Sequence, residues 1–214
     1  DIYKIIEEKF DFVFGKQDGL LDYGFEIVTD PCTLPFLEKN LKNLLILMRQ
    51  LGLRSHNTST CGLHIHINRA YLDDSMVARI LNMFYFNWKH MVSFSRRSES
   101  ACNRWCGNIY LKKDIDNTPL KVLGKNENRE KYIAINLLHS STIEFRIFRG
   151  SLKYITIMAS LNLINNLVRL SEKISFEESS TIEFLEIVEF NKTKYLEKYF
   201  KAQAKRLSEI NDEN

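Results

Sequence analysis

Two short segments with alternating side chains, Leu63–Ile67 and Thr142–Arg149, constrain the fold of this chain more than any other part of its sequence. Successive side chains of a β-strand point to opposite faces. In the first segment His64 and His66 therefore share one face, and the aliphatic residues around them share the other. Such a strand belongs to a sheet that packs on a core by one side and leaves the other side open.

The second segment repeats this design with charged residues. Its apolar side is formed by Ile143, Phe145 and Ile147, and its other side is expected to carry Glu144, Arg146 and Phe148. Arg149 is expected to leave the strand just before Gly150. If the two strands belong to one sheet, Glu144 and Arg146 face the same way as the two histidines.

The remaining pattern predicts a mixture of helices and strands without regular alternation. Apolar spacing predicts helices over Ile2–Phe10, Leu34–Leu51, Asp73–Ser95 and Leu152–Ser171, and strands over Phe12–Phe14, Tyr23–Thr29, Gly62–Asn68, Lys131–Leu138 and Thr142–Phe148. The last two strands are expected to form a hairpin, and Gln17-Asp18-Gly19 is expected to be a turn. This order favours an α+β fold with a mainly antiparallel or mixed sheet and helices packed on one face.

Length and composition exclude several classes of protein. A chain of 214 residues fits one domain with a small helical appendage, which we place at 1–175 and 176–214. The net charge of +3 is too small to indicate nucleic acid as the main partner. No apolar run reaches the roughly 18 residues of a membrane helix. The four cysteines show no disulfide framework, so we expect reduced thiols in a cytoplasmic protein.

The polar strand face is suited to binding a metal or a phosphate group. Paired imidazoles are ligands for both, and a carboxylate next to a guanidinium provides for a cation and for phosphate oxygens. Glu26, on the strand with Phe25 and Ile27 on its opposite face, adds a third polar element. Magnesium is the cation that carboxylates and phosphates favour, and the histidines leave manganese or zinc open.

Each of these features also has a simpler interpretation. The histidine pair can be a surface pair without a role, Glu144 and Arg146 can be a salt bridge on a sheet face, and Glu26 can be an exposed strand charge. The sequence contains no phosphate-binding glycine loop, no nucleophile elbow and no HExxH motif. A nucleotide bound here would therefore be held on a sheet face and not at a helix N-terminus.

Four segments in order, GFEIVTDP, CGLHIHIN, YIAINLL and TIEFRIFRG, resemble the amidoligase family. These carboxylate–amine ligases are related to glutamine synthetase and glutamate–cysteine ligase, and the resemblance runs from about Phe12 to about Leu170. It implies a glutamine-synthetase-like catalytic domain with a curved, mainly antiparallel sheet. It also implies ATP-dependent formation of an amide or peptide-like bond through an acyl phosphate, from small-molecule or peptide carboxylate and amine substrates.

The resemblance also implies roles for individual residues. It assigns a divalent cation, Mg²⁺ or Mn²⁺, to His64, Glu144 and Glu26, and a phosphate contact to His66. Arg146 would stabilise the transferring phosphoryl group and act with Glu144 as a catalytic residue, and Arg149 would be a second phosphate contact. Asn136 and Arg97 would contact substrate or nucleotide.

One departure from the family keeps two alternatives open. Members usually open with a Gly-x-Glu-x-Glu strand that supplies metal-binding carboxylates, and no such strand precedes Gly24. Either a segment with this strand belongs upstream, or the chain is a catalytically reduced nucleotide- or metal-binding module on the same fold. A metal-dependent hydrolase is a third reading. We expect substrate specificity to lie in Ser98–Glu130, and a homo-oligomer is compatible with the resemblance.

Overall fold

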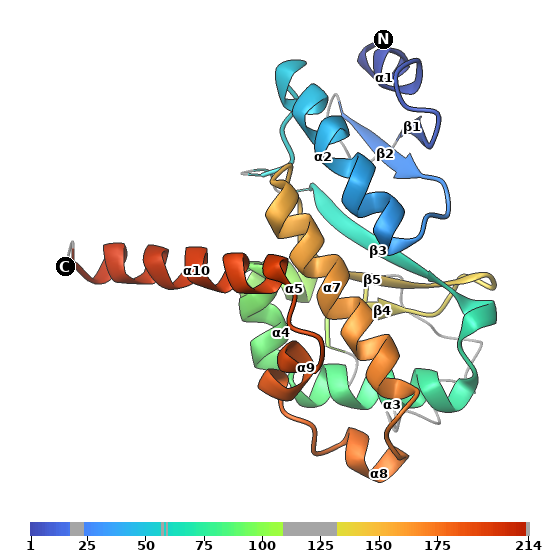
Figure 1. The fold of residues 1–214 in the computed structure, drawn as a ribbon, viewed down its shortest axis with the longest axis vertical. Helices are drawn as coiled ribbons and strands as arrows, with labels where there is room; N and C mark the ends of the chain where they lie inside the picture. Colours follow the sequence, from blue (N-terminus) through green and yellow to red (C-terminus); the bar gives the residue numbers. More distant parts are fainter. Residues whose placement is uncertain (18–23, 57, 59, 109–131, 213–214) are drawn as a thin grey trace.

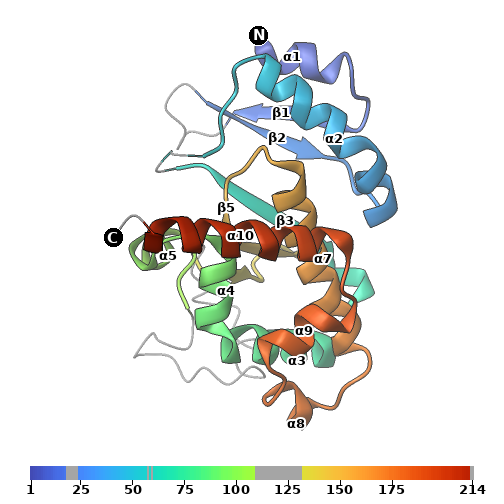
Figure 2. The same cartoon turned by 60° about the vertical axis from the view of Figure 1, so that its left-hand side comes forward.

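The computed structural model describes residues 1–17, 24–56, 58, 60–108 and 132–212, with the backbone alone for 206–212. It contains both helices and strands, and the strands form two small antiparallel sheets (Figures 1 and 2). The helices are α1 Ile2–Glu7, α2 Leu34–Gln50, α3 Asp74–Phe86, α4 Trp88–Ser95, α5 Glu99–Trp105, α7 Tyr154–Ser171, α8 Phe176–Ser179, α9 Phe184–Phe190 and α10 Lys194–Asp212. Within the described residues, no helix combines the length and the apolar character needed to cross a bilayer.

The larger sheet contains the two strands that dominate the sequence pattern. Its order is β3 (Gly62–Asn68), β5 (Thr142–Arg149) and β4 (Ile135–Asn136), with antiparallel pairing throughout. The predicted hairpin before Thr142 is present, but β4 is only two residues long. The predicted bounds of β3 are correct, and β5 extends one residue further than predicted, to Arg149.

The ladder between β3 and β5 contains an extra residue. His66 lies opposite Glu144 and Ile65 opposite Phe145, but the next pairs are Leu63 with Phe148 and Gly62 with Arg149. Two residues of β5 therefore face the single residue His64, which is the pairing of a β-bulge.

The bulge changes which β5 side chains reach the polar face. Residues directly opposite each other in an antiparallel pair share a face. Phe148 therefore lies on the Leu63 side, where it is buried against Phe94. The prediction that Phe148 shares the face of Glu144 is wrong. Arg149 remains in the strand, opposite Gly62, and so the prediction that it leaves the strand is also wrong.

The main core lies on the apolar side of this sheet. Ile143, Phe145 and Ile147 are fully buried there. They belong to one hydrophobic cluster with residues of α3, α4, α7, α9 and α10. The alternating side chains of these strands thus give the sheet an apolar side, which packs on helices, and a polar side, which carries the histidines.

The N-terminal part forms the second sheet. Strands β1 (Val13–Gln17) and β2 (Phe25–Thr29) pair with each other, with Glu26 opposite Lys16. A second hydrophobic cluster joins this sheet to α1, α2 and the start of α7. Leu63 of β3 packs against both clusters, and residues of α7 belong to both.

Helix ends follow local capping, and the largest difference from the predicted helices is a division of one of them. The helix predicted over Ile2–Phe10 ends earlier, at Glu7, and that predicted over Leu152–Ser171 begins later, at Tyr154. Thr33 caps α2 and Asp73 caps α3 with side-chain oxygens, as their positions before apolar periods suggest. The long helix predicted over Asp73–Ser95 is divided at Asn87 into α3 and α4. The Asn87 side chain donates to the carbonyls of Met83 and Ile182, and such bonds compete with regular helix.

The C-terminal helices pack on the rest of the molecule. Leu196 and Tyr199 of α10 are buried in the main core. Tyr195 donates to Glu38 of α2 at 2.7 Å and lies 3.1 Å from the hydroxyl of Tyr154 on α7. These helices thus contact the rest of the chain extensively. The proposed domain boundary after residue 175 stays a prediction.

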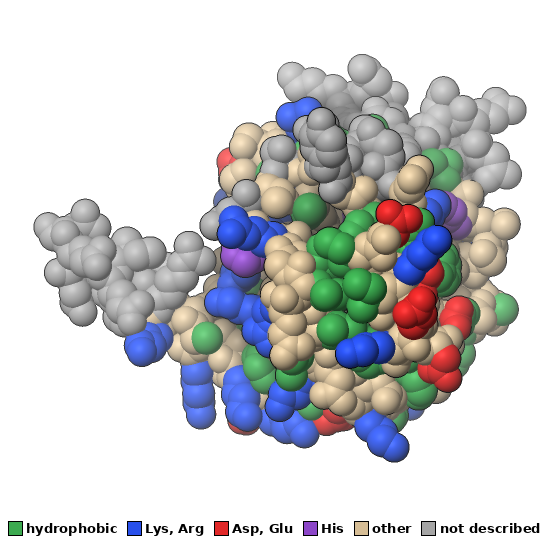
Figure 3. Space-filling view, turned by 90° about the horizontal axis from the view of Figure 1, so that it is seen from above, with side chains coloured by type: hydrophobic (Ala, Val, Ile, Leu, Met, Phe, Trp, Pro, Cys, Tyr) green, Lys and Arg blue, Asp and Glu red, His purple; other side chains and the backbone are tan. Residues whose placement is uncertain are grey.

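Several large apolar side chains at the N-terminal end are exposed. They are Ile2, Ile5, Phe14 and Phe36. Figure 3, which views this end of the molecule, shows hydrophobic side chains beside acidic and basic ones. Exposed apolar side chains are common on protein surfaces and do not by themselves indicate an interface. The homo-oligomer that the resemblance allows is therefore not tested by this surface.

Candidate active site

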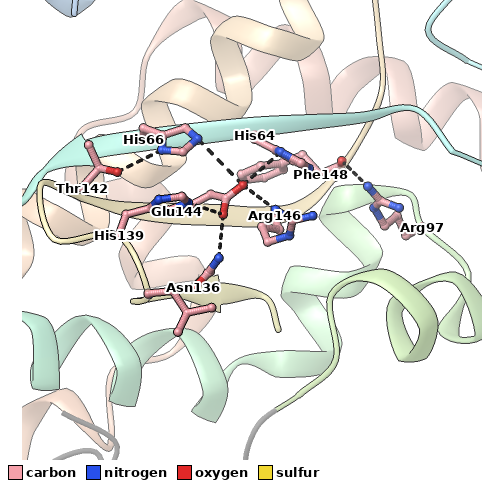
Figure 4. A network of polar contacts seen from close by, with 10 residues as sticks. His64, His66, Arg97, Asn136, His139, Thr142, Glu144, Arg146 and Phe148 are labelled. Atoms are coloured by element: carbon pink, nitrogen blue, oxygen red, sulfur yellow. Dashed lines mark hydrogen bonds and ion pairs between the residues drawn. The ribbon is translucent and has the colours of Figure 1, made fainter. Parts of the chain in front are cut away.

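The polar face of the larger sheet converges on Glu144. This carboxylate is 3% exposed and lies on the middle strand, between β3 and β4. Oε1 accepts hydrogen bonds from Arg146 Nη1 at 2.6 Å and, at 3.0 Å, lies within reach of His64 Nδ1. Oε2 accepts from Asn136 Nδ2 at 2.9 Å. Three other residues that the sequence singled out thus each contact Glu144 (Figure 4).

The surroundings of Glu144 keep it ionised. Burial raises the pKa of a carboxyl group, because the charged form loses hydration. The hydrogen bond from His64, the positive charge of Arg146 and the hydrogen bond from Asn136 act in the opposite direction and prevail. Together they lower the pKa of Glu144 from 4.5 to about 2.

His66 lies beside the same carboxylate but is directed differently. Its Nε2 is 3.8 Å from Glu144 Oε1, beyond a hydrogen bond, and its Nδ1 lies 3.1 Å from the hydroxyl of Thr142. Burial lowers the pKa of His66, and the charge of Glu144 partly offsets this. Since its side chain is still 43% exposed, a ligand on this face can reach the ring.

A third histidine, His139, joins this site and was missed in the sequence. It follows β4, its Nε2 is 3.6 Å from Glu144 Oε2, and its ring centroid is 5.7 Å from that of His66. Its side chain is 53% exposed. Its position in a tight connection, directly before a strand rich in charged residues, was the only signal that could have indicated it.

Asn136 connects the carboxylate to the segment that carries His139. Its amide nitrogen donates to Glu144, and its amide oxygen accepts the backbone N–H of Leu138 at 2.9 Å. The Asn136 side chain is buried, so its bond to Glu144 forms out of water. Asn136 therefore fixes the position of the β4–β5 connection relative to Glu144.

Arg146 has a buried donor that no described residue satisfies. Its Nη1 binds Glu144, and its guanidinium lies 5.9 Å from the ring centroid of Tyr132. Its Nε is buried without a hydrogen-bond partner among the described residues. A buried unpaired N–H is costly, and in native proteins it often indicates a missing ligand or water.

The two other predicted arginines lie at the far end of this face. Arg97 donates from Nε to the carbonyl of Ile147 at 3.0 Å and from Nη2 to that of Phe148 at 3.1 Å, which holds it at the bulge (Figure 4). Arg149 lies on the site face through its pairing with Gly62. The hydrogen bonds of Arg97 thus go to the backbone at the bulge, apart from the cluster around Glu144.

Glu26 is the predicted residue that the structure does not bring into this cluster. It lies on the separate β1–β2 sheet, and its charge acts on His66 only as the weakest of several influences on that pKa. Within the described parts of the chain, no group of three or more His, Cys, Asp or Glu side chains is arranged to hold a metal ion. The predicted site of Glu26, His64 and Glu144 thus stays a prediction.

Comparison with known proteins gives one match. Residues 7–168 match a protein-family model described as "Putative amidoligase enzyme". No curated protein and no solved structure matches the chain, so the predicted glutamine-synthetase-like fold is not confirmed by a structural neighbour. The matched residues cover most of the 214-residue chain and include all strands of both sheets. The chain therefore belongs to this amidoligase family, which makes it an enzyme of the ligase type.

Proposed function

We propose that this protein is an ATP-dependent ligase that joins a small-molecule or peptide carboxylate to an amine through an acyl phosphate. The observation that carries the proposal is Arg146, held by the buried carboxylate of Glu144 while its Nε has no hydrogen-bond partner among the described residues. A guanidinium with unsatisfied donors is suited to oxyanions, and phosphoryl transfer needs such a group.

ATP, when bound, supplies the phosphoryl group that activates the carboxylate. The protein contributes charged side chains that are already in position before the reaction begins. Glu144 fixes the guanidinium of Arg146, so little reorganisation is needed when negative charge develops on the face. His66, with its ring exposed beside Glu144, is placed to contact the same charge. The strands are rigid supports, and no side-chain nucleophile is required for this chemistry.

A divalent cation is a separate prediction. Both oxygens of Glu144 already interact with protein donors, so a cation bound there would share the carboxylate with them. We therefore assign no step to a metal. Comparison of activity with Mg²⁺ and with excess EDTA tests the requirement.

The decisive experiment uses hydroxylamine as the amine. The protein is incubated with ATP, Mg²⁺, hydroxylamine and the common amino acids and short peptides as carboxylates, and hydroxamate and ADP are measured. We expect both products in equal amounts, and their loss in Arg146→Ala. Arg169→Ala, at the exposed end of α7, is the matched control. Absence of ADP formation would refute the proposal, and ATP binding that persists without ADP formation would favour a catalytically reduced module.

A further inference from the structure

Two thiols lie in contact at the end of α5 and take no part in the proposed reaction. Cys102 is 1% exposed and Cys106 is fully buried, and both belong to the main hydrophobic cluster. The backbone N–H of Cys106 donates to the carbonyl of Cys102 at 2.8 Å, so the two residues lie one helical turn apart. The thiol of Cys102 donates a hydrogen bond to the sulfur of Cys106. The two cysteines thus form a dithiol.

The surroundings of this dithiol give its two sulfurs different chemistry. The hydrogen bond from Cys102 lowers the pKa of Cys106, burial opposes this, and the positive charges of Arg97 and Arg146 add to the lowering. The same hydrogen bond and burial raise the pKa of Cys102. Cys106 is therefore the sulfur that becomes a thiolate, and Cys102 is the one that keeps its proton. An attacking and a resolving sulfur of this kind are typical of redox-active dithiols, whereas cysteines buried among apolar groups alone are inert.

Hydrogen bonds connect Cys106 to Arg146 of the site. Gly107 directly follows Cys106, and its N–H donates to the carbonyl of Tyr132 at 2.9 Å while its own carbonyl accepts the N–H of Ala134 at 3.1 Å. The carbonyl of Ala134 in turn accepts the backbone N–H of Arg146 at 2.8 Å. The ring of Tyr132 lies 5.9 Å from the Arg146 guanidinium. A displacement of Cys106 is thus transmitted to both the backbone and the side chain of Arg146.

We propose that Cys102 and Cys106 form a redox switch that a hydroperoxide closes to a disulfide. The Cys106 thiolate attacks one oxygen of hydrogen peroxide and the O–O bond breaks, which leaves a sulfenic acid and a hydroxide that takes up the proton lost by Cys106. The Cys102 sulfur then attacks the Cys106 sulfur, the S–O bond breaks, and the departing hydroxide leaves as water with the Cys102 proton. One peroxide is reduced to two waters, and two thiols are oxidised by two electrons to one disulfide.

Closure of the disulfide changes the geometry of this helical turn. Cβ atoms four residues apart on a helix are about 5–6 Å from each other, whereas a disulfide needs about 3.5–4.5 Å. Closure therefore draws Cys106 and Gly107 toward Cys102. Cys106 can follow this movement because it has already left the helical conformation, with φ −154° and ψ 52°. We expect the hydrogen bonds of Gly107 with Tyr132 and Ala134 to weaken. A strained disulfide is also readily reduced, which suits a reversible switch.

Trypsin provides a direct test, because it cleaves after Arg104, between the two cysteines. The reduced wild-type protein is treated with an equimolar amount of hydrogen peroxide, its remaining thiols are alkylated, and it is digested without reductant. We expect peptides 98–104 and 105–112 to be joined, and to separate after addition of dithiothreitol. Peroxide is little larger than water, so it needs a smaller opening of the structure than a bulky reagent. Iodoacetamide should therefore modify the half-buried Cys32 and Cys61 of the untreated protein first.

Variants and hydrogen exchange complete the test. In Cys102→Ala the resolving sulfur is absent, so peptide 105–112 should gain two oxygen atoms as Cys106 proceeds to the sulfinic acid. Cys61→Ser keeps the pair and should form the link as the wild type does. In the linked wild type, amide hydrogen exchange of residues 132–138 should become faster, and in peroxide-treated Cys106→Ala it should stay unchanged.

Two results would overturn the inference, and neither depends on ATP or on ligase activity. Unlinked peptides in the wild type, after peroxide has oxidised Cys32 and Cys61, would overturn the switch. An unchanged exchange rate of residues 132–138 in a fully linked sample would overturn its connection to Arg146. The switch and the proposed ligase can therefore fail separately.

Discussion

Replacement of Glu144 by Gln tests the electrostatics of the site most directly. The pKa of Glu144 is about 2 in the folded protein, against 4.5 without the fold. With about 1.4 kcal/mol for each pKa unit, the ionised form contributes about 3 kcal/mol of stability. Because this pKa is lowered, the contribution is complete above pH 4.5 and is lost as the pH falls toward 2.

The Glu144→Gln side chain has nearly the same shape but carries no charge. We expect its free energy of unfolding to lie below that of the wild type by the largest amount near neutral pH. The difference should shrink by about 3 kcal/mol between the two pKa values. Urea unfolding followed by circular dichroism, at a series of pH values from neutral to acid, measures it.

Two results decide the outcome of this experiment. The exposed Glu177→Gln variant is the control, and its difference from the wild type should stay small throughout, as is usual for surface substitutions. If the difference between Glu144→Gln and the wild type is the same at neutral and acid pH, then Glu144 is not held ionised by its neighbours. The reasoning about Arg146 as a prepared cation would fail with it.

Three further predictions concern other parts of the structure. Arg146→Ala should reduce hydroxamate formation by about a hundredfold, and Arg146→Lys should recover only part of it, because lysine lacks the planar fork. Asn136→Ala should lower the free energy of unfolding by about 1–3 kcal/mol in urea, because it removes one donor from Glu144 and frees the β4–β5 connection. Phe94→Ala should cost about 3–5 kcal/mol and lower the melting temperature, because Phe94 is buried against β5 and α10.

The parts of the site that lie on regular strands could be predicted from the sequence. Alternation in β3 placed His64 and His66 on one face, and alternation at the start of β5 placed Glu144 and Arg146 beside them. These assignments depend only on the two-residue period of a β-strand and on the need to bury the apolar side of the sheet. The structure agrees with the second condition, since Ile143 on the apolar side is completely buried.

The parts of the fold and site that depend on an interruption of a regular strand or helix could not be predicted from the sequence. An extra residue in β5 has no composition signal, so Phe148 was assigned to the wrong face. The division at Asn87 required knowledge of Ile182, which is remote in sequence and accepts its hydrogen bond. His139 lies in a connection, where period gives no information. The predicted turn at Asp18–Gly19 and most of the predicted specificity segment lie outside the described residues.

The bulge in β5 can be understood as a one-residue insertion. Removal of Ile147 would restore one-to-one pairing between β3 and β5 and would leave every other pair, including Gly62 with Arg149, unchanged. It would also remove the carbonyl that binds Arg97 Nε. A deletion at this position would thus keep the pairing partners of β3 and β5 while it removed one of the two carbonyls that hold Arg97. The presence of this one residue thus affects how Arg97 is held without changing which residues of β3 and β5 pair.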